Sequence, residues 1–183
     1  MNHQKNNVHV SGILSKERVN DKEVSLEISI CNTQIKSVIE RCIWEKYKDQ
    51  FPNEYQSLTI SGVLQSERND EGRLKYIIKA ANIGHFHNVL VEELDERSSQ
   101  FCGLVKLKKK FDFDTSSKLL LKRLLFETIS EKQVLLEAVA LRGIVPYFDN
   151  IQEGSVLMLK ADYVADKNGN QYWRVNHIPE FIA

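Results

Sequence analysis

Lysines at every second position are one of the few local patterns in this 183-residue chain that could bind a ligand by charge. Lys106, Lys108 and Lys110 would share one face of a β-strand, because side chains project alternately from its two sides, and Lys109 and Phe111 would share the other. Three ammonium groups on one face could neutralise several phosphates, with binding that weakens steeply as salt rises. The pattern equally fits a solvated strand, or a sheet edge that lysines protect from aggregation.

Aromatic and basic side chains occur together in two other segments. Tyr76 follows Lys75, and the pair Tyr172 and Trp173 precedes Arg174. An aromatic ring can stack on a nucleobase while a neighbouring cation holds a phosphate. Packing in a hydrophobic core would explain the rings as well. Adjacent Tyr172 and Trp173 point to opposite faces of a strand, however, so both cannot be core residues of a one-sided sheet.

Histidines and aspartates give little support for metal or catalytic chemistry. His85 and His87 stand two apart, but a metal site needs further ligands. Asp112 and Asp114 precede a Thr-Ser-Ser stretch, where aspartates usually form turns. No segment matches a nucleophile elbow, a phosphate-binding loop or a Cys/His zinc array. We expect no catalysis, no cofactor and no metal; a small nuclease that uses these aspartates and histidines is a third alternative to the two functions below.

Composition predicts a folded protein without a membrane segment. The 25 basic and 25 acidic side chains cancel, so any electrostatic recognition must come from a local patch. No run of 18 apolar residues is present, and the first twelve residues lack the apolar core of a secretory signal. Three widely spaced cysteines without a Cys-x-x-Cys pair favour a reducing compartment. We expect a cytoplasmic protein, or a nuclear one in a eukaryote, and not a secreted one.

Alternating apolar and polar residues predict strands over most of the chain. Residues 115–130 fit either a helix that Ser116 caps or a buried strand, and residues 146–155 predict a turn. The segments expected as strands are 8–14, 24–30, 58–68, 73–83, 103–113, 134–145 and the closing hairpin 156–178.

One amphipathic helix is expected over residues 33–51. Apolar residues recur from Ile35 to Tyr47 at the i, i+3, i+4 spacing of a helix face, and Pro52 disfavours helical geometry at Phe51. This helix would cap a barrel or sheet. Alternatively, Trp44 and Phe51 at its edge would contact a partner protein.

The chain divides into two similar halves. The stretch "VEELDERSSQ" (91–100) is acidic and then Ser-rich, which marks a boundary. We therefore expect one domain over 1–92, a linker over 93–100 and a second domain over 101–183. The hairpin at 58–84 recurs at 156–178, and each copy ends in a strand that carries aromatic and basic residues.

These motifs resemble those of OB-fold nucleic-acid-binding proteins. The segments "VHVSGIL", "LTISGVL" and "VALRGIV" share a strand-Gly-hydrophobic core, and "NIQEGSVLMLKADYVADKNGNQYWRVNHI" is similar to the closing strands of an OB-fold. The first half is similar to bacterial single-stranded-DNA-binding proteins, in which a helix precedes a hairpin with a D-x-G turn. The resemblance covers about 8–84 and 101–181. The first copy lacks an obvious third strand between Ile30 and the helix.

The resemblance implies a mainly β protein with one or two helices, built as two tandem OB-like small β-barrels. It also implies a non-catalytic protein that binds single-stranded nucleic acid, DNA rather than RNA, in replication, repair or a nucleoprotein complex. The alternative is a subunit that binds a protein partner through the barrel surface or helix 33–51, which the zero net charge favours. The expected nucleic-acid-binding residues are Lys75, Tyr76, Lys106, Lys108, Lys110, Tyr172, Trp173 and Arg174.

Overall fold

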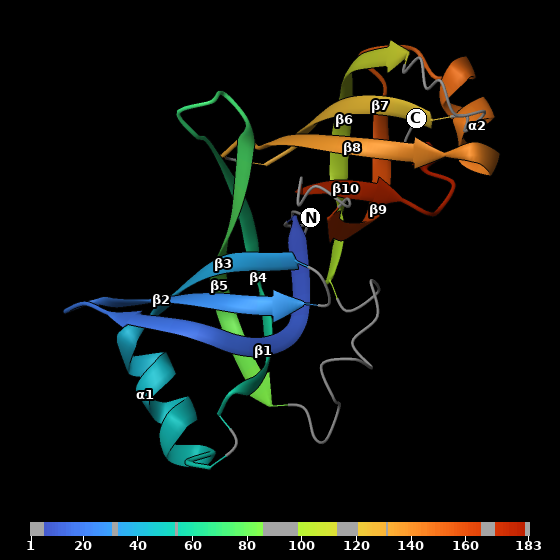
Figure 1. Ribbon diagram of the computed structural model, residues 1–183. Coiled ribbons are helices and arrows are strands. Elements are labelled where there is room, and N and C mark those ends of the chain that lie inside the picture. The colour runs from blue at the N-terminus through green and yellow to red at the C-terminus, as the bar shows by residue number, and fades with distance from the viewer. Residues whose placement is uncertain are drawn as a thin grey trace.

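The computed structural model describes residues 6–30, 33–53, 55–85, 99–112, 121–130, 132–165 and 171–181. Most of these residues lie in strands, which form two small barrels side by side, each with one short helix (Figure 1). The predicted mainly β architecture of two tandem barrels is therefore confirmed. Among the described residues, no helix is long and apolar enough to cross a membrane.

Barrel 1 is closed by five strands and carries α1 (Arg41–Gln50) between its third and fourth strands. Each strand is hydrogen-bonded to the next in the order β1-β2-β3-β5-β4-β1, and only β3 and β5 run parallel. The strands are β1 (Asn7–Val19), β2 (Glu23–Ile30), β3 (Thr33–Glu40), β4 (Ser57–Arg68) and β5 (Leu74–His85).

Barrel 2 repeats this topology in the order β6-β7-β8-β10-β9-β6, with β8 and β10 parallel. A 3-10 turn, η3 (Arg142–Ile144), and α2 (Val145–Asn150) take the place of α1. The short β11 (Glu180–Phe181) pairs with β9. The barrel strands are β6 (Ser99–Asp112), β7 (Leu121–Thr128), β8 (Leu135–Leu141), β9 (Val156–Ala165) and β10 (Gln171–Val175).

The two barrels also match in register. The pairing of β1 with β2 shifts between Leu14 and Lys16, and that of β6 with β7 shifts between Leu107 and Lys109. Both shifts are β-bulges. Val8 precedes Leu14 by the same number of residues as Phe101 precedes Leu107, so Val8 and Phe101 occupy equivalent positions in the two barrels. Val8 and Phe101 are themselves partners where β1 pairs with β6. The barrels are therefore related by an approximate two-fold axis near this pair, and the repeat predicted from the two hairpins extends to every strand of the barrel.

The prediction of a helix over 33–51 was wrong for its first half. Residues 33–40 form β3, whose Ile35, Ser37 and Ile39 are buried while Gln34 and Lys36 are exposed. The apolar residues of this segment fit both a helical and an alternating pattern, and pairing along the whole length of β2 decides for the strand. β3 is thus the third strand that the first copy seemed to lack.

Three other segments differ from expectation or were ambiguous. In the ambiguous stretch 115–130, Leu121–Thr128 form the strand β7. The expected turn over 146–155 contains most of α2, and Gly143 lies in η3 rather than in a strand. Residues 93–98 of the expected linker lie outside the described residues, whereas Ser99 and Gln100 already belong to β6.

Gly12 and Gly62, by contrast, lie in strands where the backbone of a neighbouring strand approaches closely. A Cβ on Gly62 would lie 2.2 Å from the Lys79 carbonyl oxygen, and one on Gly12 would lie 2.5 Å from that of Ser29. Real Cβ atoms do not tolerate such contacts, so larger residues at these positions would force the strands apart.

Helix α1 closes one end of barrel 1 with two aromatic side chains. Trp44 and Tyr47 are buried, and their stacked rings lie 5.6 Å apart. The Trp44 Nε1–H donates to Glu17 Oε1 at 2.7 Å, and the Tyr47 hydroxyl donates to the Ser57 carbonyl at 3.1 Å. Burial raises the pKa of Tyr47 to about 12. Full burial of each large side chain contributes about 1.5–3 kcal/mol, so these contacts hold the short helix in place.

Side chains of each barrel contact the other barrel across the boundary between them. The Tyr76 ring, from the β4–β5 hairpin of barrel 1, lies 5.7 Å from Trp173 and 6.1 Å from Tyr163 of barrel 2. Its hydroxyl oxygen accepts a hydrogen bond from the Glu137 backbone N–H at 2.8 Å. In the reverse direction, Gln171 Nε2–H donates to the Gln34 carbonyl at 2.9 Å. These contacts add to the β1–β6 pairing and fix the barrels relative to one another.

Candidate nucleic-acid interface

The outer side of β6, β7, β8 and β10 forms a surface that we call the barrel 2 face. Side chains on directly paired residues of neighbouring strands point to the same side. Two rows result: Phe111, Arg123, Val139 and Arg174, and next to it Lys109, Leu125, Glu137 and Tyr172. Residues between these rows, such as Leu124, Ala138 and Trp173, are buried in the barrel.

Phe111 is an aromatic residue of this face that lies near two cationic groups. The Lys109 ammonium nitrogen lies 5.0 Å from the centre of its ring, and the Arg123 guanidinium carbon lies 5.6 Å from it. The ring is half-buried, whereas the Lys109 side chain is exposed. A base stacked on this ring would lie beside two cations that can hold phosphates.

The prediction that Lys106, Lys108 and Lys110 share one face of the strand was wrong for Lys110. Lys106 and Lys108 are exposed as expected, and Lys108 Nζ lies 3.2 Å from Glu127 Oε2. The bulge at Lys108, however, reverses the alternation beyond it, so Lys109 faces outward and Lys110 turns toward α2. The Lys110 ammonium donates to the carbonyls of Phe148 and Asp149, both at 3.2 Å, and of Ile151 at 2.9 Å. It therefore satisfies the C-terminal carbonyl groups of α2.

Two of the predicted aromatic platforms are buried. Tyr76 is 4% exposed and Trp173 is 0% exposed, so neither ring is available to a base in this structure. Trp173 fills barrel 2, with Tyr163 at 5.0 Å and Phe101 at 5.8 Å. Burial also raises the pKa of the Tyr76 hydroxyl well above its usual value. Alternation along a strand predicts on which face of the sheet a side chain lies, but it does not predict whether another part of the protein covers that face. Tyr76 is covered by barrel 2.

The remaining predicted residues lie on outer surfaces. Tyr172 is half-buried on the barrel 2 face, in the row of Lys109. Arg174 lies on the same face with a side chain that is 19% exposed, and its Nη2 is 3.9 Å from Asp162 Oδ2. Lys75 is exposed on β5 of barrel 1. The structure therefore brings Lys106, Lys108, Tyr172 and Arg174 to one face and leaves Lys75 on the other barrel.

Sequence analysis missed Phe111, Lys109 and Arg123 as candidate site residues. Strict alternation assigned Phe111 and Lys109 to the side opposite Lys106. A signal for the bulge was present, because three consecutive lysines, 108–110, interrupt the apolar alternation, and bulges often occur where an alternation breaks. Arg123 lay in the segment that fitted a helix and a strand equally well.

The equivalent surface of barrel 1, which we call the barrel 1 face, is basic but lacks aromatic residues among its described members. Its two rows are Arg18, Ser25, Val38 and Lys79, and Lys16, Glu27, Lys36 and Ile77. The described aromatic side chains of barrel 1 lie elsewhere: Trp44, Tyr47, Phe51 and Tyr55 gather around α1, and Tyr76 at the barrel boundary.

The structure describes only some of the histidines and aspartates that the sequence singled out. His85 Nδ1 lies 2.8 Å from the Ser57 carbonyl oxygen, and its ring stacks on Phe51 at 4.8 Å. Asp112 is the last residue of β6, whereas His87 and Asp114 lie outside the described residues. Within the described ranges, no group of three or more His, Cys, Asp or Glu side chains could hold a metal ion.

Comparison with known proteins shows similarity at the level of structure. No family model matches the chain, and no curated protein sequence matches it. The crystal structure of the wild-type single-stranded DNA binding protein from Thermus aquaticus matches with a TM-score of 0.72 and 14% sequence identity, over 99% of this chain and 94% of that one. A deletion mutant of the same protein matches with a TM-score of 0.73 and 14% identity, over 100% and 97%. The shared fold confirms the OB resemblance predicted from the sequence.

Proposed function

We propose that this chain binds single-stranded DNA, without catalysis, on the barrel 2 face. The observation that carries the proposal is the Phe111 ring beside Lys109 and Arg123 on the outside of a closed five-stranded barrel. β7 and β8 are the second and third strands of this barrel, and that pair of strands binds oligonucleotides in OB-folds. The fold shared with a single-stranded DNA binding protein supports the same conclusion.

The charges of this face favour a polyanion that binds by displacement of ions. Lys106 and Lys109 are exposed and form no ion pair with a described residue. Lys108 and Arg123 contact Glu127 and Glu137, at 3.2 and 2.9 Å. Exposed ion pairs of this kind stabilise a protein by at most about 1 kcal/mol, so phosphates can compete for both cations. We expect affinity to fall as salt rises, by a slope of about 0.7 per phosphate contacted.

Binding of a protein partner to the same face is the second candidate function. Half-buried leucines lie among the charges, and directly paired Leu121 and Leu141 lie at one end of β7 and β8. Apolar side chains in an outer sheet face are typical of surfaces that bind proteins. Within the first proposal the same leucines would contact sugars and bases.

We also propose that the chain acts in replication, repair or another nucleoprotein complex, as a protein that binds single-stranded DNA.

The test is titration of fluorescently labelled oligonucleotides of about 30 nucleotides, which reaches the upper site size of two OB barrels. Single-stranded DNA, single-stranded RNA and duplex DNA are compared by anisotropy at low and moderate salt. We expect saturable binding of single-stranded DNA that weakens with salt. Absence of binding even at low salt would overturn the proposal and direct the search to a protein partner.

The site is tested by Phe111→Ala, with Tyr147→Ala as control. Loss of one base-aromatic stack costs about 1–3 kcal/mol, which corresponds to an affinity about 5- to 150-fold weaker. Tyr147 is 46% exposed on α2 and is not one of the residues of the barrel 2 face, so its removal should leave affinity unchanged. Thermal unfolding of both variants shows whether they fold. Equal affinities of the two folded variants would mean that Phe111 is not the stacking residue.

A further inference from the structure

We propose that the two barrels recognise different parts of one strand: barrel 2 stacks bases, whereas barrel 1 holds phosphates only. This inference rests on the proposed function and adds a second surface to it, the barrel 1 face. It predicts a nucleic-acid-binding surface that spans both barrels but is sensitive to the bases at one end only.

The first argument is the comparison of equivalent positions. Arg18 and Phe111 lie at the same distance beyond the bulges of β1 and β6, and their partners Ser25 and Arg123 are equivalent. The parallel pair of Ile78 with Ser37 in barrel 1 is equivalent to the pair of Trp173 with Ala138 in barrel 2. The residues that precede Ile78 and Trp173 are therefore equivalent as well, so Ile77 matches Tyr172. Phe111 and Tyr172, the aromatic residues among the described members of the barrel 2 face, are therefore replaced by non-aromatic residues in barrel 1.

Two basic residues of the barrel 2 face, by contrast, are kept, whereas Arg123 is replaced by Ser25. Lys16 matches Lys109, each next to its bulge, and Lys79 matches Arg174, as the partners Val38 and Val139 show. A cation without an adjacent ring can neutralise a phosphate but offers no surface on which a base can stack. The barrel 1 face thus keeps one of the two contacts that single-strand binding uses.

The second argument is the exposure of these cations. Lys16, Arg18, Lys36 and Lys79 are all exposed, and none forms an ion pair with a residue in the described ranges. Glu27 is the Cα partner of both Lys16 and Lys36 and lowers the net charge of this face. Three or four uncompensated cations around one carboxylate suit a few phosphates of a strand.

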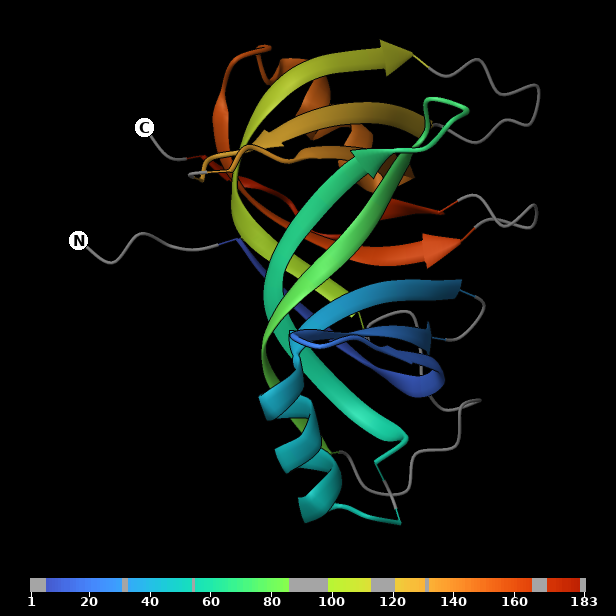
Figure 2. The same ribbon diagram turned by 90° about the vertical axis from the view of Figure 1, so that its left-hand side faces the viewer.

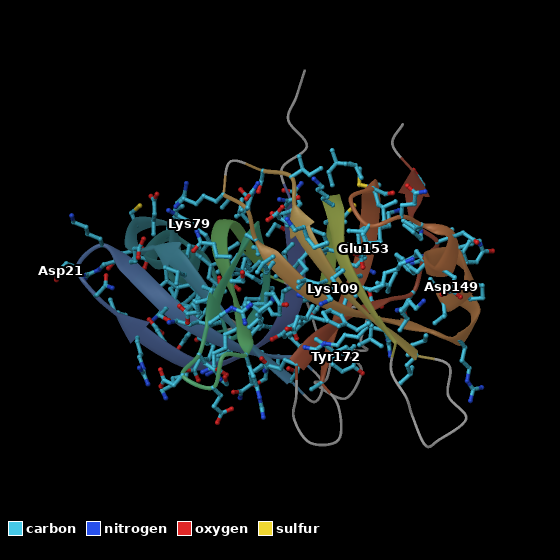
Figure 3. The ribbon with its side chains drawn as sticks, turned by 90° about the horizontal axis from the view of Figure 1, so that it is seen from above. Asp21, Lys79, Lys109, Asp149, Glu153 and Tyr172 are labelled. Atoms are coloured by element: carbon cyan, nitrogen blue, oxygen red, sulfur yellow. The ribbon has the colours of Figure 1, made fainter. Side chains whose placement is uncertain are left out.

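The third argument is continuity between the two faces. The hydrogen bond from Gln171 to the Gln34 carbonyl brings the starts of β10 and β3 together, and β3 lies next to the strands of barrel 2 in both side views (Figures 1 and 2). Seen from above, Lys109 and Tyr172 lie on the part of barrel 2 that borders barrel 1 (Figure 3). Lys79 lies on barrel 1 in the same view. One strand can therefore extend from one face to the other.

The test uses oligonucleotides of about 30 nucleotides in which either the 5′ half or the 3′ half consists of abasic sites. Both retain every phosphate. We expect one of them to bind nearly as well as the complete strand and the other at least about tenfold more weakly, because several stacks are lost only when the abasic half lies on barrel 2. Equal weakening by the two halves would show that both barrels stack bases and would overturn the inference.

The phosphate contacts are tested by a triple variant, Lys16→Ala, Lys36→Ala and Lys79→Ala. Removal of three phosphate contacts should lower the salt slope of single-strand binding by about 2. The matched control removes Lys46, Lys132 and Lys160, three exposed lysines outside both faces, and should keep the slope. If the triple variant keeps the same salt slope as its control while the unaltered chain still binds DNA through Phe111, this inference is overturned and the proposed function stands. Absence of DNA binding by the unaltered chain would instead overturn the proposed function.

Discussion

Barrel 1 and barrel 2 have the same strand order, the same parallel pair and the same bulge, yet they differ in what fills and covers them. The paired core residues Leu64 and Ile78 of barrel 1 correspond to Tyr163 and Trp173 of barrel 2. Barrel 1 is closed by a ten-residue helix, and barrel 2 by a helix of six. The shared backbone thus tolerates aliphatic and aromatic cores, as is expected where the register of hydrogen-bonded strands defines the fold.

The outer faces differ in the same way. Basic residues recur at two equivalent positions, whereas the aromatic residues among the described members of the two faces lie on barrel 2. The difference shows that the fold by itself does not assign a function to either barrel, since function depends on the side chains that the fold presents. Four measurements can break or sharpen this comparison.

The largest effect is expected from Trp173→Ala, compared with Ile78→Ala at the equivalent position. Both residues are fully buried, and removal of a buried tryptophan costs about 3–5 kcal/mol of unfolding free energy, because it leaves a large cavity. The smaller isoleucine should cost less. Chemical denaturation measures both values. A Trp173→Ala variant of normal stability and reduced DNA affinity would restore Trp173 as a stacking platform.

Next in size is Tyr76→Phe at the barrel boundary. The substitution removes the acceptor of the Glu137 backbone N–H and keeps the ring against Trp173. An unsatisfied buried N–H costs about 1–3 kcal/mol, so the free energy of unfolding should fall by that amount. Tyr147→Phe, on an exposed ring, serves as control and should change stability by less than about 0.5 kcal/mol. Equal stability of the two variants would mean that the Tyr76 hydroxyl does not join the barrels.

Arg18→Phe places an aromatic ring on barrel 1 at the position that Phe111 has on barrel 2. One added stack contributes at least about 1 kcal/mol, so affinity for single-stranded DNA should rise about fivefold, less the loss from one cation. The two half-abasic oligonucleotides should then bind more equally. Arg18→Leu loses the same charge without gaining a ring and should bind more weakly than the unaltered chain. An Arg18→Phe variant no tighter than Arg18→Leu would show that the barrel 1 face does not meet the bases.

The smallest effect is expected from alkaline pH. Burial raises the pKa of Tyr76 and of Tyr163 above that of an exposed tyrosine, which is about 10. Both groups are protonated in the folded and the unfolded protein below pH 10, so their contribution is constant there. As pH rises from about 10 toward the raised values, the unfolded chain loses protons first and the free energy of unfolding falls.

Denaturation midpoints measured between pH 8 and 11 test this dependence. Tyr76→Phe should make the fall less steep than in the unaltered chain. An unchanged slope in the Tyr76→Phe variant would mean that its hydroxyl already ionises normally in the folded protein.

Much of the fold follows from local sequence features. Alternation within 24–30 and 58–83 predicts strands that the structure contains, and the turn around Gly72, which has a φ of +76°, joins β4 to β5 as expected. The repeat of the hairpin at 156–178 predicts the second barrel. These features depend on residues that are close in the chain, so their period and turn residues are sufficient to identify them.

The sequence by itself determined a mainly β chain with two copies of one barrel and a lysine-rich strand at 103–113. The tertiary structure alone decided that 33–40 is a strand, that the bulge at Lys108 turns Phe111 and Lys109 outward, and that Tyr76 and Trp173 are buried. Each of these outcomes depends on contacts outside the segment itself: β2 and β5 pair with β3, β7 pairs with the bulged part of β6, and barrel 2 covers Tyr76. Strand pairing and burial are long-range interactions, and a local periodicity therefore leaves them open.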